Sequence, residues 1–213
     1  METANYFTLL LLYMTSFITL MNPLGILPVF LTMTSELDKK GRQRTAIKSL
    51  ITAFFTLIAF AFGGQMLFNF FGISVAGLKV VGGVLFFILG YEMLNARLSR
   101  IRLTPEEVKS YENDVSITPL GIPMIAGPGS ITNAIILMDQ STTVVERSVL
   151  IASIFAVCLI ILIILLSGNS IMKVLGDTGN KVLMKLMGLI VMVLAVEFFF
   201  TGIEPYMKTI FNL

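Results

Sequence analysis

The chain contains one uncharged stretch, residues 115–138, that is long enough to cross a membrane yet cannot form a single straight helix. A transmembrane helix needs roughly 20 apolar residues. This stretch is interrupted by three prolines and three glycines: Pro119, Pro123, Pro128, Gly121, Gly127 and Gly129. Each proline removes a backbone donor, and its ring clashes with the preceding turn. At membrane depth, broken backbone is stable only where protein buries it or where it lines a water-filled cavity.

The first apolar segment, about residues 6–32, has the same kind of interruption at Asn22-Pro23-Leu24-Gly25, with Pro28 following. Interrupted segments at corresponding positions of two halves are the best sequence indication of a transporter's binding site. These two interruptions therefore guide the interpretation of the rest of the chain.

The composition is that of a polytopic membrane protein. Only 13% of the 213 residues are charged, against about 25% in soluble proteins, and the mean hydropathy is +0.91. The long apolar runs predict helices, because a transmembrane barrel would show segments of about ten residues with alternating polarity. We therefore expect an all-α fold in one transmembrane domain, residues 1–213, that is surrounded by the lipid bilayer.

Several chemistries are excluded by missing residues. The chain has no histidine, which excludes histidine-based metal sites and proton relays, and it has no phosphate-binding loop motif. Its one cysteine, Cys158, lies in an apolar run and is expected to be packed or lipid-facing. We expect no cofactor, no metal site and no nucleic-acid partner.

Reading from charge to charge predicts six membrane-spanning segments. They are residues 6–32, the span between Lys48 and Lys79 that ends near Phe71-Gly72, residues 75–95, residues 115–138, the span between Arg147 and Lys173, and residues 182–202.

The basic residues predict the orientation of these segments. Twelve of the fifteen lysines and arginines fall in the linkers after segments 1, 3 and 5, and only Lys79, Arg147 and Lys208 lie on the other side. Because cytoplasmic loops carry the excess of basic residues, we expect those three linkers in the cytoplasm and both termini outside. The third linker contains Thr104-Pro105-Glu106-Glu107, which predicts a short capped surface helix.

The two halves of the chain resemble each other. A shift of 106 residues places Leu78-Lys79-Val80-Val81-Gly82 on Met184-Lys185-Leu186-Met187-Gly188, and a shift of about 105 places Asn22-Pro23 on Gly127-Pro128. A shift of 96 would instead align two Pro-Leu-Gly-Ile tetrapeptides, but only the longer shift also aligns the third segments. Because each half has three segments, an odd number, the second half must enter the membrane in the opposite orientation to the first. We therefore predict two inverted three-helix repeats, about 1–96 and 115–213, around a cytoplasmic linker, 97–114.

The interruptions predict two pairs of half-helices whose ends meet near the middle of the membrane. Asn22 can cap a new helix that starts at Pro23, and Gly127-Pro128-Gly129-Ser130 can do the same in segment 4. Helix N-termini bind anions such as carboxylates, and unwound carbonyls can receive an ammonium group. Neither interruption carries a charged side chain, which favours a small zwitterionic solute over a strongly charged one.

The predicted substrate-binding residues are the small, polar or helix-breaking residues at the two interruptions: Thr19, Asn22, Pro23, Gly25, Pro119, Gly121, Gly127, Pro128, Gly129, Ser130, Thr132 and Asn133. The alternative is that they only allow helices to pack closely, as small residues do in membranes.

Two acidic residues, Glu92 and Glu197, lie within predicted segments, each about three turns past a lysine and so near the far end of its helix. They are candidates for proton coupling or gating, or else interfacial carboxylates exposed to headgroups. Gly83 and Gly90 share one helix face and predict a helix contact. The phenylalanines at 54–55, 86–87 and 198–200 are interpreted as apolar bulk for lipid or packing.

The motifs of this chain resemble those of the MarC/SnatA family of bacterial and archaeal inner-membrane proteins. The resemblance covers essentially the whole chain and rests on Asn22-Pro23-Leu24-Gly25-Ile26-Leu27-Pro28, Pro119-Leu120-Gly121-Ile122-Pro123 and Ala126-Gly127-Pro128-Gly129-Ser130-Ile131. It implies a multi-pass protein of the cytoplasmic membrane that exports or takes up small neutral amino acids such as glycine and alanine.

The first hypothesis is accordingly a secondary transporter that works by alternating access. Its coupling ion could be H+ or Na+, and it could form a homo-oligomer. The second is a channel-like pore for a small polar solute. An intramembrane enzyme is disfavoured, because no G-x-S-x-G, H-E-x-x-H or carboxylate pair lies within a segment. A membrane scaffold that transports nothing is the remaining alternative.

Overall fold

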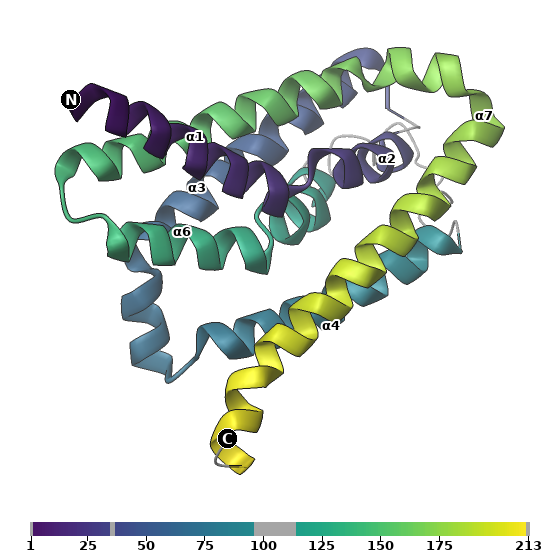
Figure 1. The fold of residues 1–213 in the computed structure, drawn as a ribbon. Helices are drawn as coiled ribbons and strands as arrows, with labels where there is room; N and C mark the ends of the chain where they lie inside the picture. The colour runs from purple at the N-terminus through teal and green to yellow at the C-terminus, as the bar shows by residue number, and fades with distance from the viewer. Residues whose placement is uncertain (1, 35–36, 96–113, 212–213) are drawn as a thin grey trace.

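A computed structural model describes residues 2–34, 37–95 and 114–211, and it contains helices and no strand over those ranges (Figure 1). Five helices are long and apolar enough to cross a membrane, and a sixth span is added when one bent helix pair is counted as a span. The all-helical expectation is therefore confirmed, and the predicted six spans agree with the larger count.

Segment 1 forms two helices, α1 (Glu2–Met21) and α2 (Pro23–Met33), that are separated by the single residue Asn22. The Asn22 N–H donates to the Ile18 carbonyl at 3.0 Å, and its own carbonyl accepts from the Ile26 N–H at 3.2 Å. The interruption at Asn22-Pro23 was predicted correctly, but a break that begins near Thr19 was also expected. The helix is interrupted only at Asn22, because helical hydrogen bonds reach this residue from both sides.

Two capped helices follow. α3 (Lys39–Phe71) starts at Lys39, well before the expected start after Lys48, because the Asp38 carboxylate accepts a 2.7 Å bond from the Gly41 N–H. It ends at the predicted place, where Gly72 adopts φ 63°. α4 (Val75–Leu94) matches its predicted bounds, and the Ser74 hydroxyl caps it by accepting from the Gly77 N–H.

Segment 4 is an irregular helical segment, η2 (Ser116–Ile125), followed by a regular helix, α6 (Pro128–Gln140), and the two are bent by 61° at the break between them. Thr118 and Ile122 are extended, as the residues before Pro119 and Pro123 should be, because a proline ring disfavours helical backbone in the residue before it. The predicted broken segment 4 is therefore confirmed.

Segments 5 and 6 lie in α7 (Val144–Phe211), whose two helical arms are joined at a kink at the non-helical Gly176, where φ is 64°. Its first arm contains the span Val144–Gly168 and its second arm the span Gly188–Phe211. The two spans are separate, and the three lysines of the predicted linker, Lys173, Lys181 and Lys185, lie between them as expected. The linker is helical on both sides of Gly176, whose missing Cβ permits the turn.

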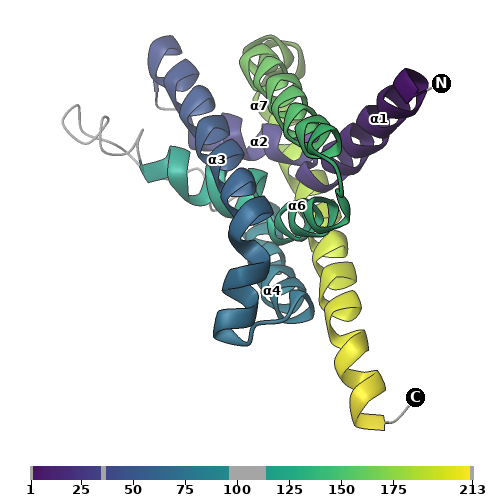
Figure 2. The same ribbon diagram turned by 90° about the vertical axis from the view of Figure 1, so that its left-hand side faces the viewer.

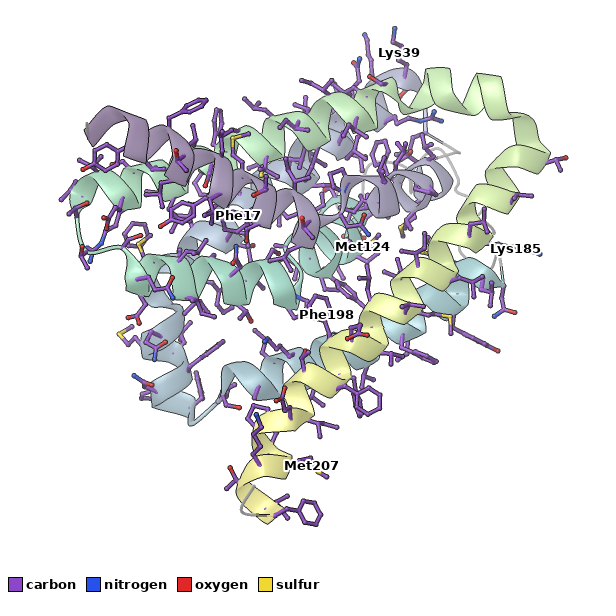
Figure 3. The ribbon with its side chains drawn as sticks, in the orientation of Figure 1. Phe17, Lys39, Met124, Lys185, Phe198 and Met207 are labelled. Atoms are coloured by element: carbon purple, nitrogen blue, oxygen red, sulfur yellow. The ribbon has the colours of Figure 1, made fainter. Side chains whose placement is uncertain are left out.

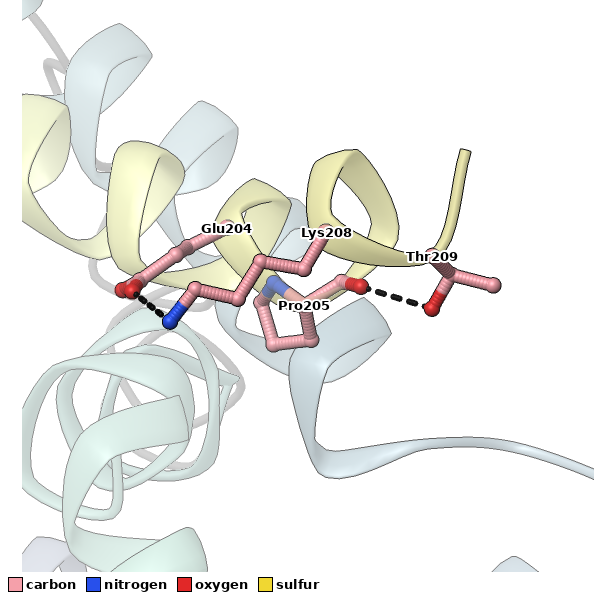
Figure 4. Close-up of polar contacts among 4 residues, drawn as sticks. All are labelled: Glu204, Pro205, Lys208 and Thr209. Atoms are coloured by element: carbon pink, nitrogen blue, oxygen red, sulfur yellow. Dashed lines mark hydrogen bonds and ion pairs between the residues drawn. The ribbon is translucent and has the colours of Figure 1, made fainter. Parts of the chain in front are cut away.

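The second arm of α7 also continues past the predicted end at residue 202. The Lys208 ammonium lies 2.7 Å from the Glu204 carboxylate, and the Thr209 hydroxyl donates to the Pro205 carbonyl at 2.9 Å (Figure 4). These contacts lie in the last turns of the helix, which ends at Phe211. The longer arm moves the centre of the span toward Glu197.

The molecule has two parts in both views: α4 and the second arm of α7 lie on one side, and α1, α2 and the first arm of α7 lie on the other (Figures 1 and 2). The buried core runs through the larger part and includes Phe17 and Phe30. We call α4 together with the second arm of α7 the helix pair, because α4 packs mainly against α7.

Glycines bring the two members of the helix pair together. A Cβ at Gly83 would lie 2.7 Å from the Ala195 carbonyl oxygen, and one at Gly90 would lie 2.7 Å from the Gly188 carbonyl oxygen. Position numbers therefore rise on one helix as they fall on the other, so the helices run antiparallel. The helix contact predicted for Gly83 and Gly90 is confirmed.

Other predictions about organisation stay predictions. Lys39 and Lys185, from two of the three basic linkers, lie toward the same end of the molecule (Figure 3), but which end faces the cytoplasm is untested, and so is the inverted repeat. The predicted surface helix at Thr104-Pro105-Glu106-Glu107 lies outside the described residues.

Candidate functional site

A cavity of about 170 Å³ lies at the interruption of segment 1, between α1–α2 and the helix pair. Its walls are mostly apolar and come from five elements: Thr19, Leu20, Met21, Asn22, Gly25, Ile26, Phe86, Leu89, Met124, Val191, Leu194, Glu197 and Phe198. Three of the predicted binding residues, Thr19, Asn22 and Gly25, are among them. The polar groups of the cavity are therefore gathered at the Asn22 break and on Glu197.

The Asn22 break places oppositely polarised helix ends at this cavity. α1 ends here, and the carbonyl of Thr19 lacks its usual helical donor because residue 23 is a proline with no N–H. α2 begins here, and the Asn22 side-chain oxygen accepts from the Gly25 N–H at 3.2 Å. The carboxyl end of α1 is favourable for a cation and the start of α2 for an anion.

Asn22 itself is held in the left-handed region at φ 43°. Asparagine adopts this region more readily than most residues with a side chain. Its amide nitrogen would lie 2.6 Å from a Cβ at residue 25. The Asn22 side chain can therefore fold over the first turn of α2 only because Gly25 has no Cβ. These two residues form one structural unit at the break.

The second break lies directly behind the first. A Cβ at Gly129 would lie 2.7 Å from the Phe198 ring and 3.2 Å from the Leu20 side chain, and both of those residues line the cavity. A Cβ at Gly127 would lie 2.8 Å from the Phe86 ring, which also lines it. The two interrupted segments are therefore neighbours, as predicted, and two aromatic rings lie between the cavity and the start of α6.

The polar side chains at the start of α6 differ in their bonding. The Ser130 hydroxyl donates to the Gly127 carbonyl at 2.9 Å and so closes the break internally. Thr132 is only 4% exposed, and its hydroxyl has no hydrogen-bond partner among the described residues. The side-chain nitrogen of Asn133 is likewise buried without a partner in that part of the chain. Buried polar groups are nearly always bonded, so these two call for an explanation.

The remaining predicted site residues lie away from the cavity. Gly121 packs against α3, where its Cβ would lie 3.0 Å from Thr52, and Pro128 packs against Gly82 of α4. Pro23 and Pro119 do not line the cavity. From η2 it is Met124 that reaches the wall. These prolines and glycines shape the breaks and do not themselves present groups to a solute.

The two acidic candidates separate. Glu92 is half-buried near the end of α4 and does not line the cavity. Glu197 lines it, near the middle of the span Gly188–Phe211. The expectation that Glu197 sits near a helix end was wrong, because α7 continues for fourteen residues beyond it.

Comparison with known proteins decides the family. Residues 7–207 match the family described as MarC family integral membrane protein. The chain belongs to the MarC family. Among relatives, an UPF0056 membrane protein of Pyrococcus abyssi is 39% identical over 86% of this chain and 88% of its own length. UPF0056 membrane protein YvbG of Bacillus subtilis is 35% identical over the same shares.

MarC family relatives occur in both archaea and bacteria and match along nearly their whole length. An UPF0056 membrane protein of Buchnera aphidicola is 30% identical over 97% of each chain. No solved structure matches this chain. The match confirms the resemblance found in the sequence, and the names of these relatives state no solute.

Some cavity residues of this MarC family member were not predicted. Phe86 and Phe198 were interpreted as apolar bulk, but both line the cavity, and their ring centroids are 5.9 Å apart. Figure 3 shows Phe198 between α6 and the crossing of α4 and α7. Phe198 could have been predicted as a cavity residue because it directly follows Glu197, the one acidic residue in the predicted segment 182–202.

Proposed function

We propose that the protein is a secondary transporter of small neutral amino acids, of the size of glycine and alanine, that exports or exchanges them by alternating access. The observation that carries this proposal is the cavity at the Asn22 break, bordered by the end of α1, the start of α2 and Glu197. Its volume of about 170 Å³ is well below the roughly 300–1,000 Å³ of pockets for drug-sized ligands. Such a space suits a solute of a few heavy atoms.

The ammonium group and the carboxylate of a zwitterion each have a matching place at this site. An ammonium group fits beside Glu197 and the Thr19 carbonyl, which has no helical donor. A carboxylate fits the start of α6, where Pro128 has no N–H and the backbone N–H groups of Gly129 and Ser130 belong to the first turn. Leu20 lines the cavity and lies beside Gly129, so the two places are close to each other, with the Phe198 ring between them.

The buried groups of Thr132 and Asn133 support a polar solute near α6. Both belong to the second turn past the break, and neither polar atom has a partner within the described protein. Leaving such groups unbonded costs about 1–3 kcal/mol each, which a hydrogen-bonding solute or water would recover.

Coupling to an ion gradient is assigned to Glu197. Ionisable residues within membrane spans are costly and commonly mark an ion or proton path. Glu197 lines the same cavity as Thr19 and Asn22, whose side-chain oxygens are ligands suited to either a proton relay or Na+. The choice between these ions is left to measurement under each imposed gradient.

The test is uptake of labelled alanine into proteoliposomes that hold the purified protein. A carrier shows faster uptake when unlabelled alanine is present inside, because the loaded form reorients faster than the empty one. Protein-free liposomes are the control. Uptake without this trans-stimulation would replace the transporter with a channel-like pore, and no flux of any amino acid would overturn the proposal in favour of a scaffold.

A further inference from the structure

Two phenylalanine rings, one from each member of the helix pair, separate the cavity from the start of α6. Phe86 and Phe198 both line the cavity, with their centroids 5.9 Å apart and their planes tilted by 47°. On their far side the rings face Gly127 and Gly129, neither of which lines the cavity. The first turn of α6 is therefore covered by aromatic carbon.

The fit of the rings depends on the two glycines. A Cβ at residue 127 would lie 2.8 Å from the tip of the Phe86 ring, and a Cβ at residue 129 would lie 2.7 Å from the tip of the Phe198 ring. Real Cβ atoms do not make contacts this short, so any side chain at either place would push its ring away. The glycines act as seats for the rings.

The two rings belong to two elements that pack closely against each other. Phe86 is on α4 and Phe198 is on the second arm of α7, and these helices approach each other closely at Gly83 and Gly90. α4 makes most of its contacts with α7 and few with α6. A displacement of the helix pair as one body would lift both rings off α6 at once.

We propose that Phe86 and Phe198 form an aromatic gate between the cavity and the first turn of α6. This inference rests on the proposed function and adds the barrier that alternating access requires. With the rings seated on Gly127 and Gly129, a solute in the cavity reaches Glu197 and the end of α1 but not the N–H groups of Gly129 and Ser130. Movement of the helix pair opens the path to those groups.

The gate is tested by the accessibility of a reporter thiol behind it. Ser130 is fully buried and is replaced in Ser130→Cys, on a Cys158→Ala background that removes the native thiol. A small membrane-impermeant methanethiosulfonate is applied to proteoliposomes without amino acid, and the labelling rate is measured. Phe198→Ala or Phe86→Ala should raise this rate on the order of tenfold, the factor for a barrier lowered by about 1.4 kcal/mol.

Matched controls come from the neighbouring phenylalanines. Phe87 and Phe200 are on the same two helices but are exposed and line a groove on another face of the pair. Phe87→Ala and Phe200→Ala should leave the labelling rate unchanged. An equal rise in the controls would indicate general loosening and would overturn the gate, as would unchanged rates in both gate variants.

Two further measurements separate the possible failures. Phe198→Leu keeps apolar bulk without the ring tip, so a folded Phe198→Leu variant with faster labelling supports the gate even if Phe198→Ala does not fold. Alanine counterflow on the same preparations reports the transporter separately. Intact counterflow with unchanged labelling overturns only the gate. Absent counterflow with ring-dependent labelling overturns the transporter and leaves the barrier at α6.

Discussion

At the scale of single residues, the site depends on a few groups that break the rules of a membrane helix. Pro23 leaves the Thr19 carbonyl without its helical donor, Asn22 takes a left-handed conformation, and Glu197 places a carboxylate near the middle of a span. Each of these carries a cost in a membrane. All three costs fall in or beside one cavity, which is where a solute could offset them.

Replacing Glu197 with glutamine removes the only carboxylate among the residues that line the cavity. We expect Glu197→Gln to reduce alanine flux on the order of tenfold and to make the remaining flux independent of an imposed proton or sodium gradient. The measurement is flux in proteoliposomes under each gradient. Glu204→Gln, which breaks only the exposed ion pair with Lys208, is the control. An unchanged pH and sodium dependence would remove Glu197 from coupling.

Replacing Gly129 with leucine fills the seat of the Phe198 ring, so we expect Gly129→Leu to abolish alanine flux while the protein still inserts into the membrane. Gly63→Leu is a matched control, because a Cβ at Gly63 meets nothing within 4 Å. Flux is compared at equal amounts of purified, monodisperse protein. Wild-type flux in Gly129→Leu would count against a solute path at this break.

At the scale of elements, the helix pair is held by backbone contacts that only glycine permits. Gly90 and Gly188 face each other, and a Cβ at either would lie within 2.8 Å of the other's carbonyl oxygen. Small residues let membrane helices approach closely. Van der Waals packing and interhelical polar contacts then hold the helices together, because the hydrophobic effect does not drive association within lipid. The two helices of the pair therefore meet backbone against backbone at this position.

We expect Gly90→Leu to lower the thermal unfolding midpoint of the protein in detergent, because the added side chain meets backbone that cannot yield. Overpacking a well-packed site costs about 1–3 kcal/mol, and contact with backbone places this change at the upper end. Gly63→Leu is again the control and should leave the midpoint unchanged. An equal midpoint for both variants would show that the helix pair is not held by this contact.

At the scale of the whole molecule, the basic residues predict the orientation in the membrane. Lys39 and Lys185 lie toward one end (Figure 3), and the turn between α6 and α7 lies at the other (Figure 1). Thr142 belongs to this turn and is exposed. On a Cys158→Ala background, Thr142→Cys should react with an impermeant thiol reagent applied to intact cells, and Gln43→Cys should react only after the cells are opened. The reverse pattern would place the basic linkers outside.

The sequence by itself determined the class, the family motifs and the positions of both breaks. These follow from local rules, because a proline without an N–H and an apolar run of 20 residues have the same effect in any fold. The helix contact at Gly83 and Gly90 could likewise be read from spacing. The corner at Gly176 could not, because a glycine between two apolar spans, among Lys173, Asp177 and Lys181, is compatible with both a loop and a bend between helices.

Tertiary structure decided which residues meet. Glu197 lines the cavity and Glu92 does not. Glu197 also lies near the middle of its span, because the second arm of α7 is longer than its charge pattern suggests. It placed Phe86 and Phe198 over α6, although phenylalanines in an apolar run look alike in sequence whether they face lipid or a cavity. The physical reason is that side-chain chemistry is local, whereas the neighbour that a helix face meets depends on how all the helices pack.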